Sequence, residues 1–215
     1  MLKLRLLHPL WGFAMTCLLI LPLSSTAYSE NNPLVDLKKT VPGLRVEIRY
    51  ATADNFMKEV LYPEARCLLR RETAGKLSRV QEKLEKQGLS LKLFDAYRPL
   101  AVQKKMWAKF PMEGYVANPA KGSNHNRGAA VDVTLADKDG HELPMPSVYD
   151  EFSERSHADY AGGTEEERKN RKRLKDAMES EGFKGISTEW WHFDDSAAKD
   201  YPVLDLPFSS VDTGR

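Results

Sequence analysis

The sequence has few cysteines and no excess of charge of either sign. Its 215 residues include two cysteines, Cys17 and Cys67, and its 32 basic and 31 acidic side chains nearly cancel. So few cysteines argue against a small scaffold held together by disulfide bonds. The balanced charge gives no electrostatic reason to expect a nucleic acid or an anionic membrane as a partner. We therefore expect a globular domain that relies on a hydrophobic core.

A long apolar run occurs only at the amino terminus. The basic residues Lys3 and Arg5 precede an almost unbroken apolar run over residues 11–23, and small residues follow it up to Ala27. This layout is typical of a secretory signal peptide and predicts cleavage after Ala27. The alternative is a retained membrane anchor over residues 6–23. It is less favoured because a span needs roughly 20 apolar residues, and this stretch contains a proline and a glycine.

Removal of a signal peptide at residues 1–27 leaves one predicted domain over residues 28–215. The removed segment carries two basic and no acidic side chains, so the formal net charge changes from +1 to −1. We expect the mature protein to be exported to the periplasm or another extracytoplasmic space, without stable membrane association. Cys67 is then the only cysteine, and the adjacent Leu68 and Leu69 favour a buried structural thiol over a nucleophile.

The spacing of apolar residues predicts a mixture of strands and helices. We expect strands over 44–50, 89–97 and 129–135, and helices over 73–88, 99–110 and 164–181. Alternation over 44–50 is typical of an edge strand, and Thr164 with Glu167 forms a capping box. Residues 189–194 form a last strand or the turn that enters it. The pattern favours an α+β fold in which helices pack on a small, mostly antiparallel sheet.

An acidic residue stands in the middle of a predicted apolar strand. Asp132 lies in Ala-Val-Asp-Val, where burial is costly unless a positive partner meets the carboxylate. His125 precedes it by seven residues, and His192 follows two tryptophans further along the chain. Two histidines and one carboxylate are a common ligand set for catalytic zinc. The spacing also allows Asp132 to pair with an arginine and His192 to be a hydrogen-bonded core histidine.

Two further residues have the chemistry of catalytic groups. Glu189, three residues before His192, could take a proton from a metal-activated water. Because strand side chains alternate, the two share a site only if Glu189 lies on a bend or beside a bulge. Arg98 directly precedes Pro99 at a strand end, where it could stabilise an oxyanion or hold a carboxylate. The alternative for Arg98 is a local ion pair with Asp95.

Three short motifs together resemble the VanX-type D-alanyl-D-alanine dipeptidases, within the wider D,D-peptidase and hedgehog-like zinc fold. The motifs are DAYRP (95–99), SNHNRGAAVD (123–132) and EWWH (189–192). The resemblance runs from about Val46 to Asp194 and includes IRYATADNF (48–56), CLLRRE (67–72) and MPSVYDEFSERSH (145–157).

The resemblance assigns a role to each candidate residue. It implies that His125, Asp132 and His192 hold one zinc ion per chain, with Glu189 as the catalytic base and acid. It also implies that Arg98 steadies the transition state.

The resemblance further implies that Ser123, Tyr50 and Asp150 lie near the substrate. Pro146 and Tyr149 depart from the family pattern, which has glycine and phenylalanine at these positions. The departure affects the expected shape of the loop around the substrate and not the metal set. His141 is expected in a turn and His157 in a structural role.

The implied activity is hydrolysis of the dipeptide D-Ala-D-Ala to two D-alanines through a metal-activated water, either for antibiotic resistance or for D-alanine salvage. The alternative activity is a D,D-carboxypeptidase or endopeptidase that cleaves peptidoglycan stem peptides. A non-catalytic, zinc-stabilised binding module is a further alternative, against which Glu189 and Arg98 argue. A small dipeptide is the expected partner.

Overall fold

A five-stranded sheet forms the centre of the computed structural model, which describes residues 33–211. The predicted signal peptide, residues 1–27, lies outside the described residues. The strand order is β2 (Arg45–Val46), β4 (Ser90–Asp95), β5 (Ala130–Ala136), β7 (His192–Asp195) and β6 (Phe183–Gly185). β2 runs parallel to β4, and the other neighbouring strands are antiparallel. This arrangement confirms the predicted α+β class and the mostly antiparallel sheet.

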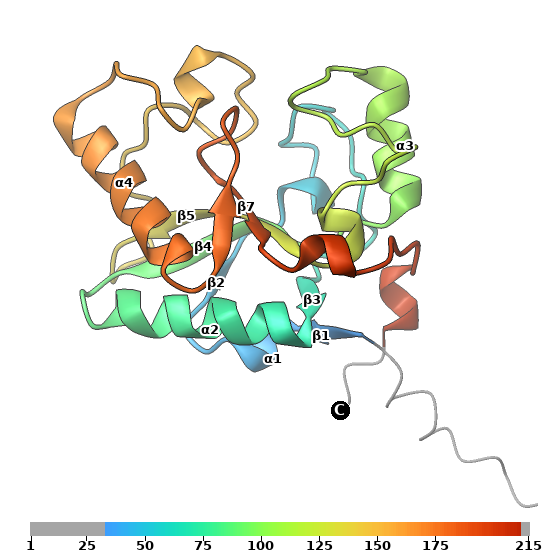
Figure 1. Ribbon diagram of the computed structural model, residues 1–215, viewed down its shortest axis with the longest axis horizontal. Coiled ribbons are helices and arrows are strands. Elements are labelled where there is room, and N and C mark those ends of the chain that lie inside the picture. Colours follow the sequence, from blue (N-terminus) through green and yellow to red (C-terminus); the bar gives the residue numbers. More distant parts are fainter. Residues whose placement is uncertain (1–32, 212–215) are drawn as a thin grey trace, which may run out of the picture.

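Helices lie on both sides of this sheet. Figure 1 shows α2 (Arg71–Glu85) along one face and α3 (Leu100–Lys109) apart from it on the other side, while α4 (Glu165–Glu179) contacts both α2 and β6. α2 buries Leu77, Val80 and Leu84 at helical spacing, which explains its amphipathic sequence. The capping box of Thr164 and Glu167 at the start of α4 is also confirmed.

A smaller sheet holds the first described residues against the domain. β1 (Leu34–Asp36) pairs antiparallel with β3 (Leu68–Arg70), and the one-turn helix α1 (Leu37–Thr40) follows β1. Cys67, directly before β3, is fully buried and unpaired. Burial, helped by the charge of Asp36, raises the pKa of this thiol to about 11. The prediction of a buried structural thiol is therefore confirmed, because so high a pKa disfavours the thiolate.

The predicted strand over 44–50 is correct in position and wrong in length. β2 lies at the edge of the sheet but contains two residues, and Arg49–Ala51 form a short 3₁₀ helix. The reason is a competing set of hydrogen bonds: the carbonyl oxygen of Tyr50 accepts from the backbone amides of Leu61 and Tyr62, at 2.9 and 2.8 Å. The chain therefore leaves β4 after Glu47, and Tyr50 enters the core. None of the helices described between residues 33 and 211 is long and apolar enough to span a membrane.

Candidate active site

Asp132 lies in the central strand of the sheet, directly opposite His192. The antiparallel register of β5 and β7 pairs these two residues, so their side chains lie on the same face. Asp132 also pairs with Asp95 across β4, where the register shifts between Leu93 and Asp95. This irregularity lets consecutive residues of β4 contact the site, which a regular strand does not allow. Both Asp132 and His192 are buried.

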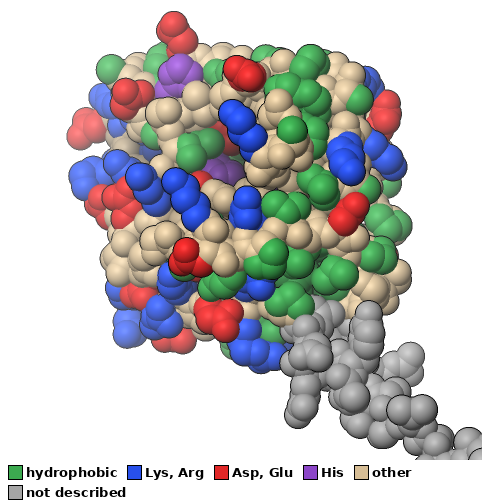
Figure 2. Space-filling view, turned by 45° about the vertical axis from the view of Figure 1, so that its right-hand side comes forward, with side chains coloured by type: hydrophobic (Ala, Val, Ile, Leu, Met, Phe, Trp, Pro, Cys, Tyr) green, Lys and Arg blue, Asp and Glu red, His purple; other side chains and the backbone are tan. Residues whose placement is uncertain are grey.

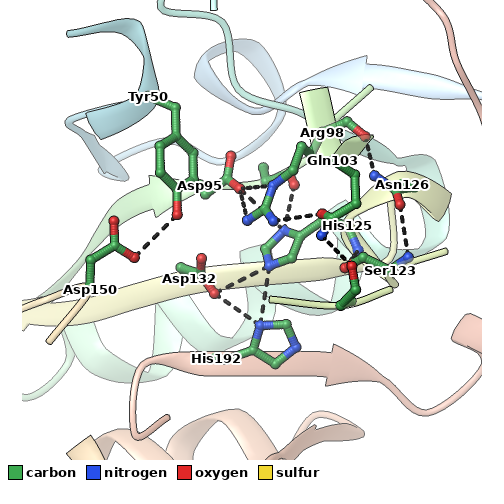
Figure 3. A network of polar contacts seen from close by, with 12 residues as sticks. Tyr50, Asp95, Arg98, Gln103, Ser123, His125, Asn126, Asp132, Asp150 and His192 are labelled. Atoms are coloured by element: carbon green, nitrogen blue, oxygen red, sulfur yellow. Dashed lines mark hydrogen bonds and ion pairs between the residues drawn. The ribbon is translucent and has the colours of Figure 1, made fainter. Parts of the chain in front are cut away.

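His125 reaches the same point from a loop. It begins a short 3₁₀ helix, His125–Arg127, which ends at Gly128 with a φ angle of 65°. The positive φ angle favours glycine here, and a Cβ atom would also lie 2.5 Å from Leu34 Cδ2 and displace that side chain. The turn at Gly128 brings the chain into β5 and places His125 over Asp132, as Figure 3 shows.

The three predicted metal ligands converge within hydrogen-bonding distance of one another. Asp132 Oδ1 lies 3.3 Å from His125 Nε2 and 3.0 Å from His192 Nδ1, and the two ring nitrogens are 3.1 Å apart. Tetrahedral zinc with bonds of about 2.0–2.1 Å separates its donors by about 3.3 Å. The spacing of these three atoms therefore fits one tetrahedral ion, with a fourth position left for a ligand.

The ring nitrogens of His125 and His192 that point away from Asp132 each have a hydrogen-bond partner. His125 Nδ1 lies 2.7 Å from the carbonyl oxygen of Ala96, and His192 Nε2 lies 2.9 Å from Asp194 Oδ1. Both partners accept hydrogen bonds, so these outer nitrogens carry hydrogen, and in the neutral rings the opposite nitrogens present lone pairs to Asp132. Three acceptor atoms then face one another, an arrangement that needs a proton or a metal ion between them.

The electrostatics of the three residues favour positive charge. Burial lowers the pKa of His192, but hydrogen bonds to Asp132 and Asp194 outweigh it and raise that pKa well above its usual range. Burial opposes ionisation of Asp132, yet the two histidines hold its pKa well below the usual range. A metal ion supplies the same positive charge that a proton on His192 supplies without it.

Glu189 lies where the predicted shared site requires it. It stands between a bend at 187–188 and a turn at 190–191, just before β7. Its Oε2 atom is 4.0 Å from His192 Nδ1, and its side chain is buried. Burial, with smaller contributions from Asp132 and Asp150, raises the pKa of Glu189 to about 8, while His192 opposes this rise. A carboxyl group with a pKa near neutrality can both accept and deliver a proton.

Asp150 and Tyr50 form a second polar pair in the same cavity. The Tyr50 hydroxyl donates to Asp150 Oδ1 at 3.1 Å, as Figure 3 shows. The other oxygen, Oδ2, is buried and has no hydrogen-bond partner among the described residues. Burial and the nearby charge of Asp132 raise the pKa of Asp150 to about 7. Asp150 also has a φ angle of 61°, an uncommon backbone conformation that positions its carboxylate.

Arg98 fits both roles that the sequence allows, an ion pair with Asp95 and a place beside the candidate catalytic groups. Its Nε and Nη2 atoms donate to Asp95 Oδ2 at 3.1 and 2.7 Å, and Nη1 donates to Gln103 Oε1 at 2.8 Å. The ion pair with Asp95 is therefore present, and it is buried. The guanidinium also lines the cavity that contains His125 and Glu189. Its hydrogen bonds hold the cation rigidly at the edge of that cavity.

The cavity has a volume of about 310 Å³ and brings together all eight residues singled out from the sequence. These are Tyr50, Arg98, Ser123, His125, Asp132, Asp150, Glu189 and His192. Ser123 Oγ accepts a hydrogen bond from the His125 amide at 3.2 Å. Figure 2 shows a histidine within a hollow near the middle of one face, with basic side chains around it.

The other two histidines among the described residues, His141 and His157, lie outside the three-residue group. His157 Nε2 is 3.3 Å from the Tyr115 hydroxyl, and His141 is exposed directly after the turn at 138–140, beside Asp137. The departures at Pro146 and Tyr149 leave Asp150 in the cavity. Arg155 donates twice to the carbonyl oxygen of Pro146, at 2.9 and 2.7 Å, and so holds this loop.

Sequence reasoning missed several residues that support the site. Asp194 lies two residues after His192, and this i, i+2 spacing on one strand face is a signal that could have revealed it. Asn126 joins two parts of the site: it accepts from the Ser123 amide and donates to the Arg98 carbonyl, both at 2.8 Å. Tyr149 donates to Asp132 Oδ2 at 3.0 Å, so the expectation that its departure from the family pattern leaves the metal set unaffected is wrong. The partners of Asn126 and Tyr149 depend on tertiary packing, so no local pattern indicated them.

Comparison with known proteins gives the family. The family model described as D-ala-D-ala dipeptidase, Peptidase_M15, matches residues 30–212. The chain belongs to this family.

Curated relatives of this member of the D-Ala-D-Ala dipeptidase family cover most of its length. It is 41% identical to a D-alanyl-D-alanine dipeptidase of Escherichia coli K12, over 84% of this chain and 94% of the relative. It is 38% identical to an enzyme of the same name from Enterococcus faecium, over 73% of this chain and 88% of the relative. Among solved structures, the LdcB LD-carboxypeptidase is 21% identical with a TM-score of 0.43, over 84% of this chain and 79% of that one. The last similarity is too low to support an inference about activity.

The raised pKa of Glu189 predicts how pH changes the stability of this family member without metal. The folded pKa of about 8 lies above the ordinary value of 4.5, so the folded state binds this proton more tightly. Stability should therefore fall as pH rises from about 4.5 to 8. Asp150 and His192, whose pKa values are also raised, act in the same direction. In Glu189→Gln the melting temperature of the metal-free protein should fall less between pH 5 and pH 8. Parallel melting curves for the two proteins would contradict the burial of an ionisable Glu189.

Proposed function

We propose that this protein is a zinc-dependent dipeptidase that hydrolyses D-Ala-D-Ala to two molecules of D-alanine. Family membership and the curated relatives support this activity. The observation that carries it is the convergence of His125, Asp132 and His192 on one point, with Glu189 beside them in one cavity. Four such groups within a small cavity provide a metal ligand set and a general base.

The proposed zinc ligands are His125 Nε2, Asp132 Oδ1 and His192 Nδ1. The nitrogen and carboxylate donors and their spacing fit zinc, and three protein ligands leave a position open. When bound, zinc supplies an acidified water and a positive charge for the oxygen of the scissile carbonyl.

Glu189 is the proposed proton carrier. Its ionised carboxylate accepts a proton from the attacking water while the new C–O bond forms. It then delivers this proton to the nitrogen of the leaving D-alanine as the C–N bond breaks. The pKa raised by burial suits both steps, because a group that titrates near neutral pH exchanges protons in either direction at little cost.

Arg98 is the proposed stabiliser of the negative charge that develops on the carbonyl oxygen. Its bonds to Asp95 and Gln103 place a fixed cation at the cavity wall before substrate arrives. A preorganised cation in a buried site stabilises the transition state without reorganisation at the moment of reaction.

The two termini of a free dipeptide have proposed partners at different walls of the cavity. Asp150 offers a negative charge and an oxygen without a partner, which suits the substrate ammonium group. The Ser123 hydroxyl lines the cavity and can donate to the substrate carboxylate. A stem peptide has an amide at the place of the ammonium and would leave Asp150 buried and unpaired. The cost of leaving Asp150 unpaired favours a dipeptidase that acts on the free dipeptide over the D,D-carboxypeptidase or endopeptidase alternative.

The proposed site of action is outside the cytoplasm, in the periplasm or another extracytoplasmic space. The basic and apolar pattern of residues 1–27 supports export, and the family match begins at residue 30, just after Ala27. Mass spectrometry of the native protein should place its amino terminus at or near Tyr28. An intact Met1 on a cytosolic protein would contradict export.

The proposed activity predicts a strict requirement for a free amino group. The purified protein should contain about one zinc ion, lose activity on chelation and regain it with added zinc. It should hydrolyse D-Ala-D-Ala and leave N-acetyl-D-Ala-D-Ala nearly untouched. Asp150→Asn should raise KM for the free dipeptide by about 10- to 100-fold, because a hydrogen bond between charged groups contributes about 1.5–3 kcal/mol.

Steady-state kinetics and metal analysis on both proteins test this prediction. Equal turnover of the free and acetylated dipeptides would contradict the role of Asp150. A zinc-loaded protein that cleaves a pentapeptide ending in D-Ala-D-Ala faster than the dipeptide would favour the carboxypeptidase alternative.

The role of Arg98 predicts a loss of rate when its geometry is changed and its charge is kept. Arg98→Lys should lower kcat by about 10²–10³-fold, as expected for removal of a preorganised oxyanion donor, with zinc content unchanged. Asp95→Asn is the comparison variant, since it removes the charge that pairs with Arg98 and keeps the guanidinium with its hydrogen bond to Gln103. If Arg98 only pairs with Asp95, both variants should lose stability and retain the kcat of the folded enzyme. A rise in KM at constant kcat in Arg98→Lys would instead indicate equal binding of ground and transition states.

A further inference from the structure

Asp132 uses its two carboxylate oxygens differently. Oδ1 faces His125 Nε2 and His192 Nδ1, whereas Oδ2 accepts a hydrogen bond from the Tyr149 hydroxyl at 3.0 Å. Tyr149 lies on the loop that follows β5, the strand that carries Asp132. It directly precedes Asp150 in the sequence. Its hydroxyl therefore contacts a proposed metal ligand through the oxygen that does not face the two histidines.

We propose that Tyr149 is a positioning residue of the metal site, which holds Asp132 so that Oδ1 alone faces the ion. This inference rests on the proposed zinc site. It goes beyond that site because it makes metal affinity depend on a residue that is not itself a ligand. A carboxylate can bind a metal through one oxygen or both, and it can rotate about its terminal bond. A donor on Oδ2 restrains that rotation and keeps Oδ2 away from the ion.

The Tyr149 ring is itself held in place by three aromatic neighbours. It stacks on Phe94 with ring centroids 4.6 Å apart and planes at 28°, and it meets Trp191 edge to face at 5.4 Å. The Tyr50 ring lies 6.3 Å away. The shifted register in β4 matters here, because Phe94 and the following Asp95 both contact site residues. The packing therefore fixes the direction from which the hydroxyl approaches Asp132.

The loop that carries Tyr149 has attachments that do not involve its hydroxyl. Trp190 Nε1 donates to the Ser147 hydroxyl at 2.8 Å, and Arg155 donates to the carbonyl oxygen of Pro146. Removal of the Tyr149 hydroxyl leaves these bonds and all three ring contacts in place. Tyr149→Phe should therefore fold normally and alter one interaction, the hydrogen bond to Asp132.

The experiment measures zinc affinity directly, by competition with a chromogenic chelator. Tyr149→Phe should raise the zinc dissociation constant by about 10- to 100-fold, the usual effect of losing a hydrogen-bond partner of a metal ligand. At saturating zinc, KM for D-Ala-D-Ala should stay close to the wild-type value, because Tyr50 still holds Asp150.

Tyr97→Phe is the matched control. The Tyr97 hydroxyl also makes partly buried hydrogen bonds: it donates to the backbone oxygen of Leu206 at 2.9 Å and accepts from the Leu206 amide at 2.7 Å, and neither bond involves a metal ligand. Its loss should lower the melting temperature and leave the zinc dissociation constant unchanged. An equal weakening of zinc binding in both variants would show a general loss of rigidity and overturn the proposal.

Two other outcomes would also overturn it. If Tyr149→Phe binds zinc within about twofold of wild type and KM rises, Tyr149 acts on the substrate loop and not on the metal. If the metal-free variant does not fold, the hydroxyl is needed by the fold itself. Wild-type protein that binds zinc but leaves D-Ala-D-Ala intact would contradict the proposed function alone, since the affinity comparison does not depend on turnover.

Discussion

The buried carboxylate of Asp132 imposes the requirement that organises this protein. A negative charge in the central strand of a sheet is tolerated only where positive charge meets it. The register of β5 and β7 supplies His192, and the turn at Gly128 supplies His125. Because both histidines have their outer nitrogens bound to acceptors, their neutral rings present lone pairs to Asp132, and a proton or a metal ion must stand between these acceptors. The demand for a cation therefore arises from the fold itself.

Other buried carboxylates in the cavity also need positive charge beside them. Asp132, Asp150 and Glu189 lie close enough for their charges to raise the pKa values of Asp150 and Glu189. A divalent cation at Asp132 and a substrate ammonium at Asp150 relieve this repulsion at two points. Glu189 lies in the same cavity, with Oε2 4.0 Å from His192 Nδ1, and burial raises its pKa to about 8 in the metal-free protein. Burial is the main cause of the raised pKa values of both Asp150 and Glu189, and the neighbouring carboxylates add to it.

The positions of the site residues are fixed by side chains from several separate segments of the chain. The Asp95 and Gln103 side chains hold Arg98, and Asn126 links the Arg98 backbone to the loop of Ser123 and His125. Tyr149 approaches Asp132 from a third segment. Each group that would contact metal or substrate is restrained by another residue, which lowers the reorganisation needed when the substrate binds.

The sequence by itself determined the α+β class, the capping box at Thr164 and the burial of Cys67, because local periodicity and composition govern these features. It also indicated the amphipathic helix, predicted over 73–88 and found at Arg71–Glu85. It also indicated the candidate residues, since an acid within an apolar strand needs a partner whatever the fold. Only the tertiary structure decided that His192 stands opposite Asp132, that β2 ends after Val46, and that Tyr149 reaches Asp132 Oδ2. These features depend on strand register and on hydrogen bonds between residues distant along the chain, and no local pattern encodes such pairings.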